Sequence, residues 1–148
     1  MKGILVLHGA NLNMLGKRDA ARYGTDTLAE IDAQMADLAA SLGCSVESFQ
    51  TNHEGEMIER IHRAHEEHID AVVINPGAWT HYSYAIRDAL EILDVPIIEV
   101  HMSNIHAREE FRRLSVIEPV AQEQIVGLGP ESYLMGLRAA MALVSENR

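Results

Sequence analysis

Polar and titratable side chains gather directly after an apolar run at residues 95–100, which is entered through Pro96. Glu99 lies in that run and His101 follows it, so the two side chains leave an extended strand on the same face. A carboxylate beside an imidazole fixes its tautomer and raises its basicity. An apolar strand that ends this way is typical of the binding crevice of a parallel sheet. A surface loop followed by a salt-bridged helix has the same composition, so this stretch alone leaves both interpretations open.

Two other apolar runs also end in polar side chains. Residues 3–7 lead to Asn11, and residues 71–74 lead to Asn75. The carboxyl ends of parallel strands meet at one edge of a sheet, and ligands bind there. We therefore expect Asn11, Asn75 and His101 to lie around one site, and this convergence favours the binding crevice over the surface loop.

Apolar runs and helical periodicities alternate along the chain. The expected strands are residues 3–7, 45–50, 71–74, 95–100 and 124–127, and the expected helices are 28–42, 54–68, 83–93 and 130–145. Strand 45–50 is the least apolar and is expected at an edge. Residues 14–26 have no sustained period and are expected to form a mobile loop. This alternation predicts an α/β fold, a flavodoxin-like three-layer sandwich with a five-stranded parallel sheet, in a single catalytic domain at residues 1–148.

The composition restricts the possible partners and compartment. The net charge is −10, which repels nucleic acid and anionic membranes, so neither is expected as a partner. An anionic substrate would need a local group of cations. Cys44 is the only cysteine, and no signal peptide or run long enough to span a membrane is evident. A cytoplasmic location is expected.

Several familiar kinds of site lack support. The chain has neither a dinucleotide-binding nor a phosphate-loop glycine pattern, and no serine lies in a nucleophile elbow. His62, His65 and His68 spread over much of a helix circumference, so a solvated face explains them better than a metal site. The remaining groups are a tyrosine, arginines, rim amides and the His101–Glu99 pair. They suit proton abstraction next to a carbonyl followed by loss of a leaving group, with no metal and no cofactor.

The chain resembles the type II 3-dehydroquinate dehydratases over essentially its whole length. The resemblance is carried by several stretches with specific residue patterns. These are Leu7-His8-Gly9-Ala10-Asn11-Leu12-Asn13, Leu15-Gly16-Lys17-Arg18, Tyr23-Gly24, Phe49-Gln50-Thr51-Asn52-His53-Glu54-Gly55-Glu56, Ile74-Asn75-Pro76-Gly77-Ala78, Thr80-His81-Tyr82-Ser83, Ala85-Ile86-Arg87-Asp88-Ala89, residues 97–113 and Ile125-Val126-Gly127-Leu128-Gly129. The family removes water from 3-dehydroquinate by anti elimination, giving 3-dehydroshikimate in the shikimate pathway.

By position, the resemblance implies catalytic roles for five residues. Tyr23 would be the base that takes the C2 proton, and Arg18 would favour its phenolate and stabilise the transition state. His101, oriented by Glu99, would protonate the departing hydroxyl. Asn11 would position a water at the enolate oxygen.

The resemblance also implies a second set of residues that bind the substrate. They are Asn75, His81 and Arg112 at the hydroxyls and ring, the backbone amides of Met102 and Ser103 at the carboxylate, and Asp88 entering from a neighbouring subunit. The family needs no cofactor and assembles as a homododecamer, a tetramer of trimers.

This chain departs from the family pattern in the segments near the expected site. Ala10 replaces a usual proline, and Asp19-Ala20 replaces a usual Glu-Pro. Loss of proline increases loop entropy, so these changes affect the expected rate rather than the chemistry. Two alternatives remain: a flavodoxin-like binding or signalling module without catalysis, and a lyase of the same family acting on a related hydroxy-keto acid.

Overall fold

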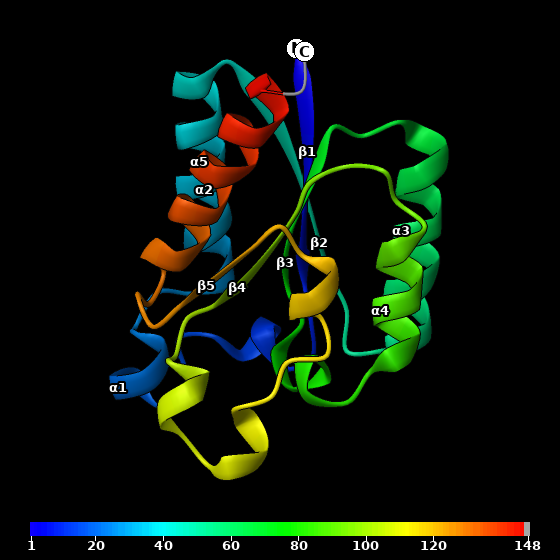
Figure 1. Ribbon diagram of the computed structural model, residues 1–148. Coiled ribbons are helices and arrows are strands. Elements are labelled where there is room, and N and C mark those ends of the chain that lie inside the picture. Colours follow the sequence, from blue (N-terminus) through cyan, green and yellow to red (C-terminus); the bar gives the residue numbers. More distant parts are fainter. Residues whose placement is uncertain (147–148) are drawn as a thin grey trace.

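The computed structural model describes residues 1–146 and has a parallel sheet of five strands between two layers of helices (Figure 1). The strand order is β2-β1-β3-β4-β5. This is the flavodoxin-like architecture predicted from the sequence. The strands are β1 (Lys2–His8), β2 (Cys44–Gln50), β3 (Ala71–Asn75), β4 (Ile97–His101) and β5 (Glu123–Val126). The helices are α1 (Ala20–Tyr23), α2 (Leu28–Leu42), α3 (Glu54–Glu67), α4 (Tyr84–Glu91) and α5 (Glu131–Glu146).

Local sequence signals set the bounds of the elements. The Thr27 hydroxyl accepts a hydrogen bond from the Glu30 amide at the start of α2, as expected for a capping box. Gly43 ends α2 in the left-handed conformation, with φ 74°, which glycine adopts without steric cost. The least apolar strand, β2, lies at an edge of the sheet, as predicted.

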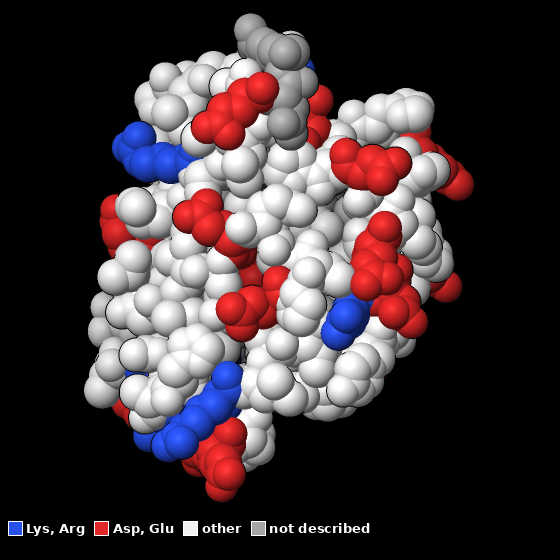
Figure 2. Space-filling view, viewed as in Figure 1, with Lys and Arg blue, Asp and Glu red and all other residues white. Residues whose placement is uncertain are grey.

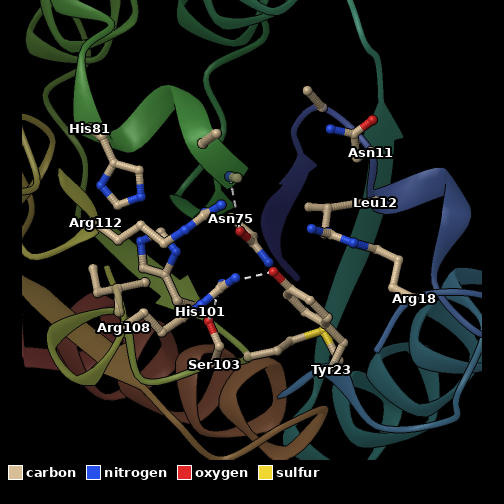
Figure 3. A pocket seen from close by; sticks show the side chains of 15 residues that line it. Asn11, Leu12, Arg18, Tyr23, Asn75, His81, His101, Ser103, Arg108 and Arg112 are labelled. Carbon is tan, nitrogen blue, oxygen red and sulfur yellow. Dashed lines mark hydrogen bonds between the residues drawn. The ribbon is translucent and has the colours of Figure 1, made fainter. Parts of the chain in front are cut away.

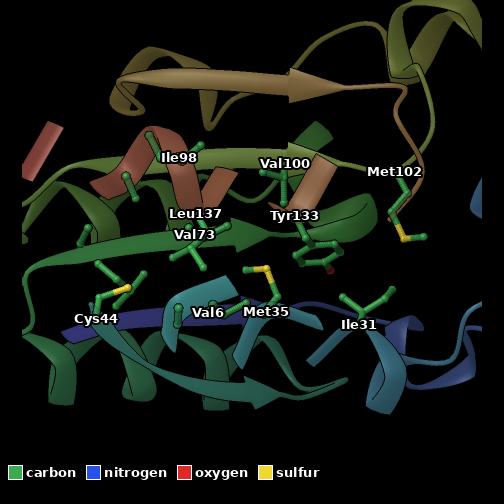
Figure 4. Packing of buried hydrophobic residues seen from close by; sticks show 14 of the residues in the cluster. Val6, Ile31, Met35, Cys44, Val73, Ile98, Val100, Met102, Tyr133 and Leu137 are labelled. Carbon is green, nitrogen blue, oxygen red and sulfur yellow. The ribbon is translucent and has the colours of Figure 1, made fainter. Parts of the chain in front are cut away.

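Helices α2 and α5 cover one face of the sheet (Figure 4). Val73 and Val100 point from the sheet into this layer, where Met35 of α2 and Leu137 of α5 pack against them. Gly136 lets α5 approach closely, because an added Cβ would lie only 2.7 Å from Val100. The apolar side chains of α3 and α4 form the second core on the other face.

Two regions differ from the expectations. Residues 14–26, expected to form a mobile loop, contain the helix α1, and a 3-10 turn at Leu12–Met14 leads into them. The Asp19 carboxylate caps α1 by accepting from the Ala21 amide, and a helix this short cannot show a period in the sequence. Strand β4 begins at Ile97 rather than residue 95, and its first amide donates to the Gln122 side chain.

The carboxyl ends of β1, β3 and β4 lie at one end of the molecule, beside α1 and the 3-10 turns that follow β4 (Figure 1). The loops after β1 and β3 touch, since a Cβ on Gly9 would collide with the Pro76 carbonyl. Acidic side chains are scattered over the face in Figure 2, with isolated basic ones between them. This distribution matches the net charge of −10. Within residues 1–146, no helix is both long and apolar enough to cross a membrane.

Candidate active site

A pocket opens where the ends of β1, β3 and β4 meet, and α1 and the segment after β4 complete its wall (Figure 3). It contains most of the residues singled out in the sequence. These are Asn11, Arg18, Tyr23, Asn75, His81, His101, Met102, Ser103 and Arg112. The structure therefore brings together side chains from four separate stretches of the chain.

Two residues of the predicted set lie outside this lining. Glu99 is fully buried behind His101. Asp88 is an exposed residue of α4 and does not line the pocket of its own chain. The expectation that it enters a neighbouring subunit's site stays a prediction.

His101 and Glu99 form a tight pair on β4. Their side chains point away from the α2–α5 layer, because the intervening Val100 packs into that layer. His101 Nε2 lies 2.6 Å from Glu99 Oε2. An ionised carboxylate can only accept, so Nε2 carries a hydrogen and Nδ1 is the ring nitrogen left for a ligand.

Two buried hydroxyls hold the carboxylate of Glu99. Thr80 donates to Oε2 at 2.6 Å, and the Ser115 hydroxyl lies 2.9 and 2.8 Å from the two oxygens. Burial raises the pKa of Glu99, but the hydrogen bond and charge of His101, with the Thr80 and Ser115 hydroxyls, bring it below its usual value. Glu99 is therefore an anion that can stabilise a protonated His101.

Tyr23 lies between two guanidinium groups. The Arg18 guanidinium stacks over its ring, 3.9 Å from the centroid, while Arg108 Nη1 donates to the phenol oxygen at 2.7 Å. Arg108 also donates to the Ser103 hydroxyl at 3.1 Å. Its contact with Tyr23 is missing from the sequence interpretation, although Arg108 stands in the polar run after β4. That segment has no regular period, so nothing in the sequence indicates where the side chain points.

His81 and Arg112 lie on the side of the pocket next to His101 (Figure 3). His81 Nδ1 contacts the Leu114 carbonyl at 2.8 Å. Burial lowers the pKa of His81; the Leu114 carbonyl opposes this, while His101 and Arg112 add to it. His81 is thus a neutral side chain at neutral pH, able to hydrogen-bond a hydroxyl. Arg112 Nε donates to Glu109 at 2.8 Å.

The amide residues occupy defined positions at the ends of β1 and β3. Asn11 has a left-handed backbone conformation, with φ 69°, which asparagine tolerates. Its backbone amide donates to Asn52 Oδ1 at 2.9 Å. Asn75 accepts from the Gly77 amide at 3.1 Å and donates to the Tyr133 hydroxyl at 3.1 Å. Both side chains line the pocket.

The pocket has the opposite charge from the protein as a whole. Arg18, Arg108 and Arg112 line it, whereas no Asp or Glu of the described chain does. Such a group of cations can hold an anionic substrate despite the net charge of −10. The same lining offers a phenol and an imidazole as proton-transfer groups. Among residues 1–146, no group of three or more His, Cys, Asp or Glu side chains is placed to hold a metal ion.

Comparison with known proteins gives a consistent match. The family model described as dehydroquinase class II matches residues 2–141. A 3-dehydroquinate dehydratase from Syntrophotalea carbinolica is 68% identical over 144 residues, covering 97% of each chain. One from Leptothrix cholodnii is 67% identical over 142 residues, covering 96% of this chain and 95% of its own. The crystal structure of a type II dehydroquinase from Butyrivibrio crossotus superimposes with a TM-score of 0.92 at 46% identity, covering 94% of this chain and 97% of that one.

Proposed function

This chain belongs to the class II dehydroquinase family, as its sequence predicts, and we propose that its pocket dehydrates 3-dehydroquinate to 3-dehydroshikimate with Tyr23 as base and His101 as acid. The observation that carries the assignment of roles is the arrangement of these two groups. Tyr23 and His101 line one pocket. The Tyr23 oxygen accepts a hydrogen bond from the Arg108 guanidinium, and the His101 imidazole is hydrogen-bonded to the buried Glu99 carboxylate. The product is an intermediate of the shikimate pathway.

The first step is removal of the C2 proton by the Tyr23 phenolate. The adjacent ketone acidifies this proton, and the electron pair moves onto the ketone oxygen to give an enolate. An ordinary tyrosine is ionised to only about 0.1% at pH 7, so the phenolate needs stabilisation. The Arg108 hydrogen bond and the Arg18 guanidinium over the ring both favour the anion. Asn11 positions a water at the enolate oxygen.

The second step is departure of the hydroxyl as water. The enolate returns its electrons, the C2–C1 double bond forms and the C1–O bond breaks, while His101 gives its proton to the leaving oxygen. Glu99 supports this step in two ways. Its charge stabilises the imidazolium before the transfer, and its contact with His101 Nε2 holds the imidazole ring in position. Proton exchange with solvent then returns Tyr23 and His101 to their starting states.

The remaining pocket residues hold the substrate. Asn75, His81 and Arg112 contact its hydroxyls and ring. The backbone amides of Met102 and Ser103, which line the pocket at the end of β4, donate hydrogen bonds to its carboxylate. The three arginines supply the positive field that an anionic substrate requires.

We propose a dodecamer of four trimers in which Asp88 reaches a neighbouring subunit's pocket. Asp88 is exposed on α4, and the large aromatic side chains of Tyr82 and Tyr84 beside it are 59% and 61% exposed. Exposed aromatic groups are frequent in interfaces between subunits. We further propose that the enzyme works in the cytoplasm without a metal or organic cofactor.

The direct test is incubation of the purified protein with 3-dehydroquinate, following the ultraviolet absorbance of the conjugated enone product. We expect turnover before and after dialysis against a chelator. Tyr23→Phe, which keeps the ring but removes the base, serves as the matched control and should be inactive. Binding of substrate without turnover by the wild-type protein would instead support a binding module and overturn the proposal.

A further inference from the structure

A second histidine–carboxylate pair lies behind the pocket, on the α2–α5 side of the sheet. His8, the last residue of β1, is fully buried. Its Nε2 lies 2.9 Å from Asp32 Oδ1 of α2, and its Nδ1 lies 2.9 Å from the Tyr133 hydroxyl of α5. Tyr133 in turn accepts from Asn75 Nδ2 at 3.1 Å. These contacts form a continuous chain from a partly exposed carboxylate to a side chain that lines the pocket.

The chemistry of each side chain fixes which group donates and which accepts at every hydrogen bond of this series. Burial raises the pKa of Asp32, but the hydrogen bond and charge of His8, with a hydrogen bond from Ser48, bring it below its usual value. Asp32 is therefore an anion that only accepts, and His8 Nε2 must carry a hydrogen. The Gly77 amide donates to the Asn75 oxygen, so Asn75 Nδ2 is the donor to Tyr133, and the one hydroxyl hydrogen of Tyr133 goes to His8 Nδ1, which accepts it.

The Tyr133 oxygen is left to accept from Asn75. Burial raises the pKa of Tyr133, so its hydroxyl stays protonated. Asn75 must then turn its NH₂ group toward Tyr133 and its oxygen toward the Gly77 amide, which donates to it. A reversed Asn75 amide would place donor against donor at Gly77. The second hydrogen of the NH₂ group is left for a ligand in the pocket.

We propose that Asp32, His8 and Tyr133 are positioning residues that lock the Asn75 amide with one N–H presented to a substrate hydroxyl. This inference rests on the proposed function, since it requires that Asn75 contact the substrate. None of the three touches the substrate; they act through Asn75. A hydrogen bond that Asn75 makes equally to bound substrate and transition state affects KM more than kcat.

A double-mutant cycle separates this role from a general loss of packing. Tyr133→Phe keeps the buried ring and removes the hydroxyl, and we expect KM to rise about 5- to 10-fold with little change in kcat. Asn75→Ala should raise KM at least as much. In the double variant, Tyr133→Phe should add nothing, because the side chain through which it acts is gone. A rise in KM of equal size in both backgrounds would overturn the inference.

The cycle also distinguishes the inference from the proposed function beneath it. If Asn75→Ala raises KM but Tyr133→Phe does not, the positioning role of Tyr133 is contradicted, whereas the contact of Asn75 with the substrate is supported. If Asn75→Ala leaves KM unchanged, the contact itself is contradicted, and the inference with it. Ser132→Ala is the matched control, because it removes the neighbouring buried hydroxyl of α5, which accepts from the Leu128 amide. Its KM should equal that of the wild type.

Asp32→Ala tests the chain from its outer end without disturbing the core, since the Asp32 side chain is 33% exposed. It removes the acceptor that fixes the His8 tautomer, and we expect KM to rise about 2- to 3-fold. Asp37→Ala, an exposed acidic residue of the same helix, should leave KM unchanged. The direction of these hydrogen bonds is visible by neutron diffraction of the full assembly. Hydrogen on His8 Nε2 and none on Nδ1 is expected; the reverse would overturn the inference.

Discussion

Two histidines end parallel strands of this sheet, and each contacts a carboxylate through Nε2. His101 on β4 meets Glu99 at 2.6 Å, and His8 on β1 meets Asp32 at 2.9 Å. The pairs lie on opposite faces of the sheet. Val6 and Val100 both point into the α2–α5 core; His8 is two residues from Val6 and faces the same way, whereas His101 is next to Val100 and faces the other way. Their second ring nitrogens differ. Within residues 1–146, Nδ1 of His101 has no hydrogen-bond partner and His101 lines the pocket, whereas Nδ1 of His8 is hydrogen-bonded to Tyr133.

The difference shows that the second nitrogen determines what such a pair can do. A histidine whose Nδ1 is open to a ligand can transfer a proton, and a buried anion stabilises the charged form that it needs. A histidine bonded on both sides has no free nitrogen and transmits orientation instead. The two carboxylates also differ in burial. Glu99 is fully buried among hydroxyl donors, whereas Asp32 is partly exposed.

The largest expected effect is the difference in kcat between variants of the two histidines. His101→Ala should lower kcat about 10³-fold, because it removes the proton donor to the leaving hydroxyl. His8→Asn should keep kcat within about threefold but lower the free energy of unfolding, since it breaks a buried network. Steady-state kinetics and urea denaturation measure the two effects. An equal loss of kcat in both variants would show that the pairs do not differ in role.

Much of this comparison could be predicted from the sequence, and part of it could not. The alternation of β4 places Glu99 and His101 on one face, and the strand ends predict their position at the edge of the sheet. The partners of His8 come from α2 and α5, which are remote in sequence. Apolar periodicity indicates which helix face is buried but not which polar side chains meet there. The contact of Arg108 with Tyr23 is hidden for a similar reason, because Arg108 lies in a segment without a regular period and Tyr23 ends a helix too short to show one.

The next effect compares the two carboxylates. Glu99→Gln should lower kcat by about tenfold or more, because the neutral amide cannot stabilise a protonated His101. Asp32→Asn should keep kcat within about twofold, since His8 takes no part in proton transfer. Both substitutions preserve side-chain size, so each serves as the other's control. A larger loss in Asp32→Asn would indicate that the His8 pair takes part in the chemistry.

The smallest effect is on acid stability. The pKa of Glu99 is lowered from 4.5 in the folded protein, so its contribution to stability is fully present above about pH 4.5 and is lost as pH falls through the lower folded value. Glu99→Gln should therefore flatten the fall in melting temperature below this pH. Asp32→Asn should flatten it less, and only below about pH 3.8, because water screens the partly exposed Asp32. Melting curves between pH 3 and 7 would measure both slopes, and a steeper fall in Glu99→Gln would contradict the assignment.

The assignment of Tyr23 as base and His101 as acid is tested most directly by exchange of the C2 proton of 3-dehydroquinate in heavy water. His101→Ala should lose elimination but still exchange this proton, because the base remains and the enolate can form. Tyr23→Phe should lose both exchange and elimination. Exchange that persists in Tyr23→Phe but disappears in His101→Ala would contradict the account and reverse the two roles.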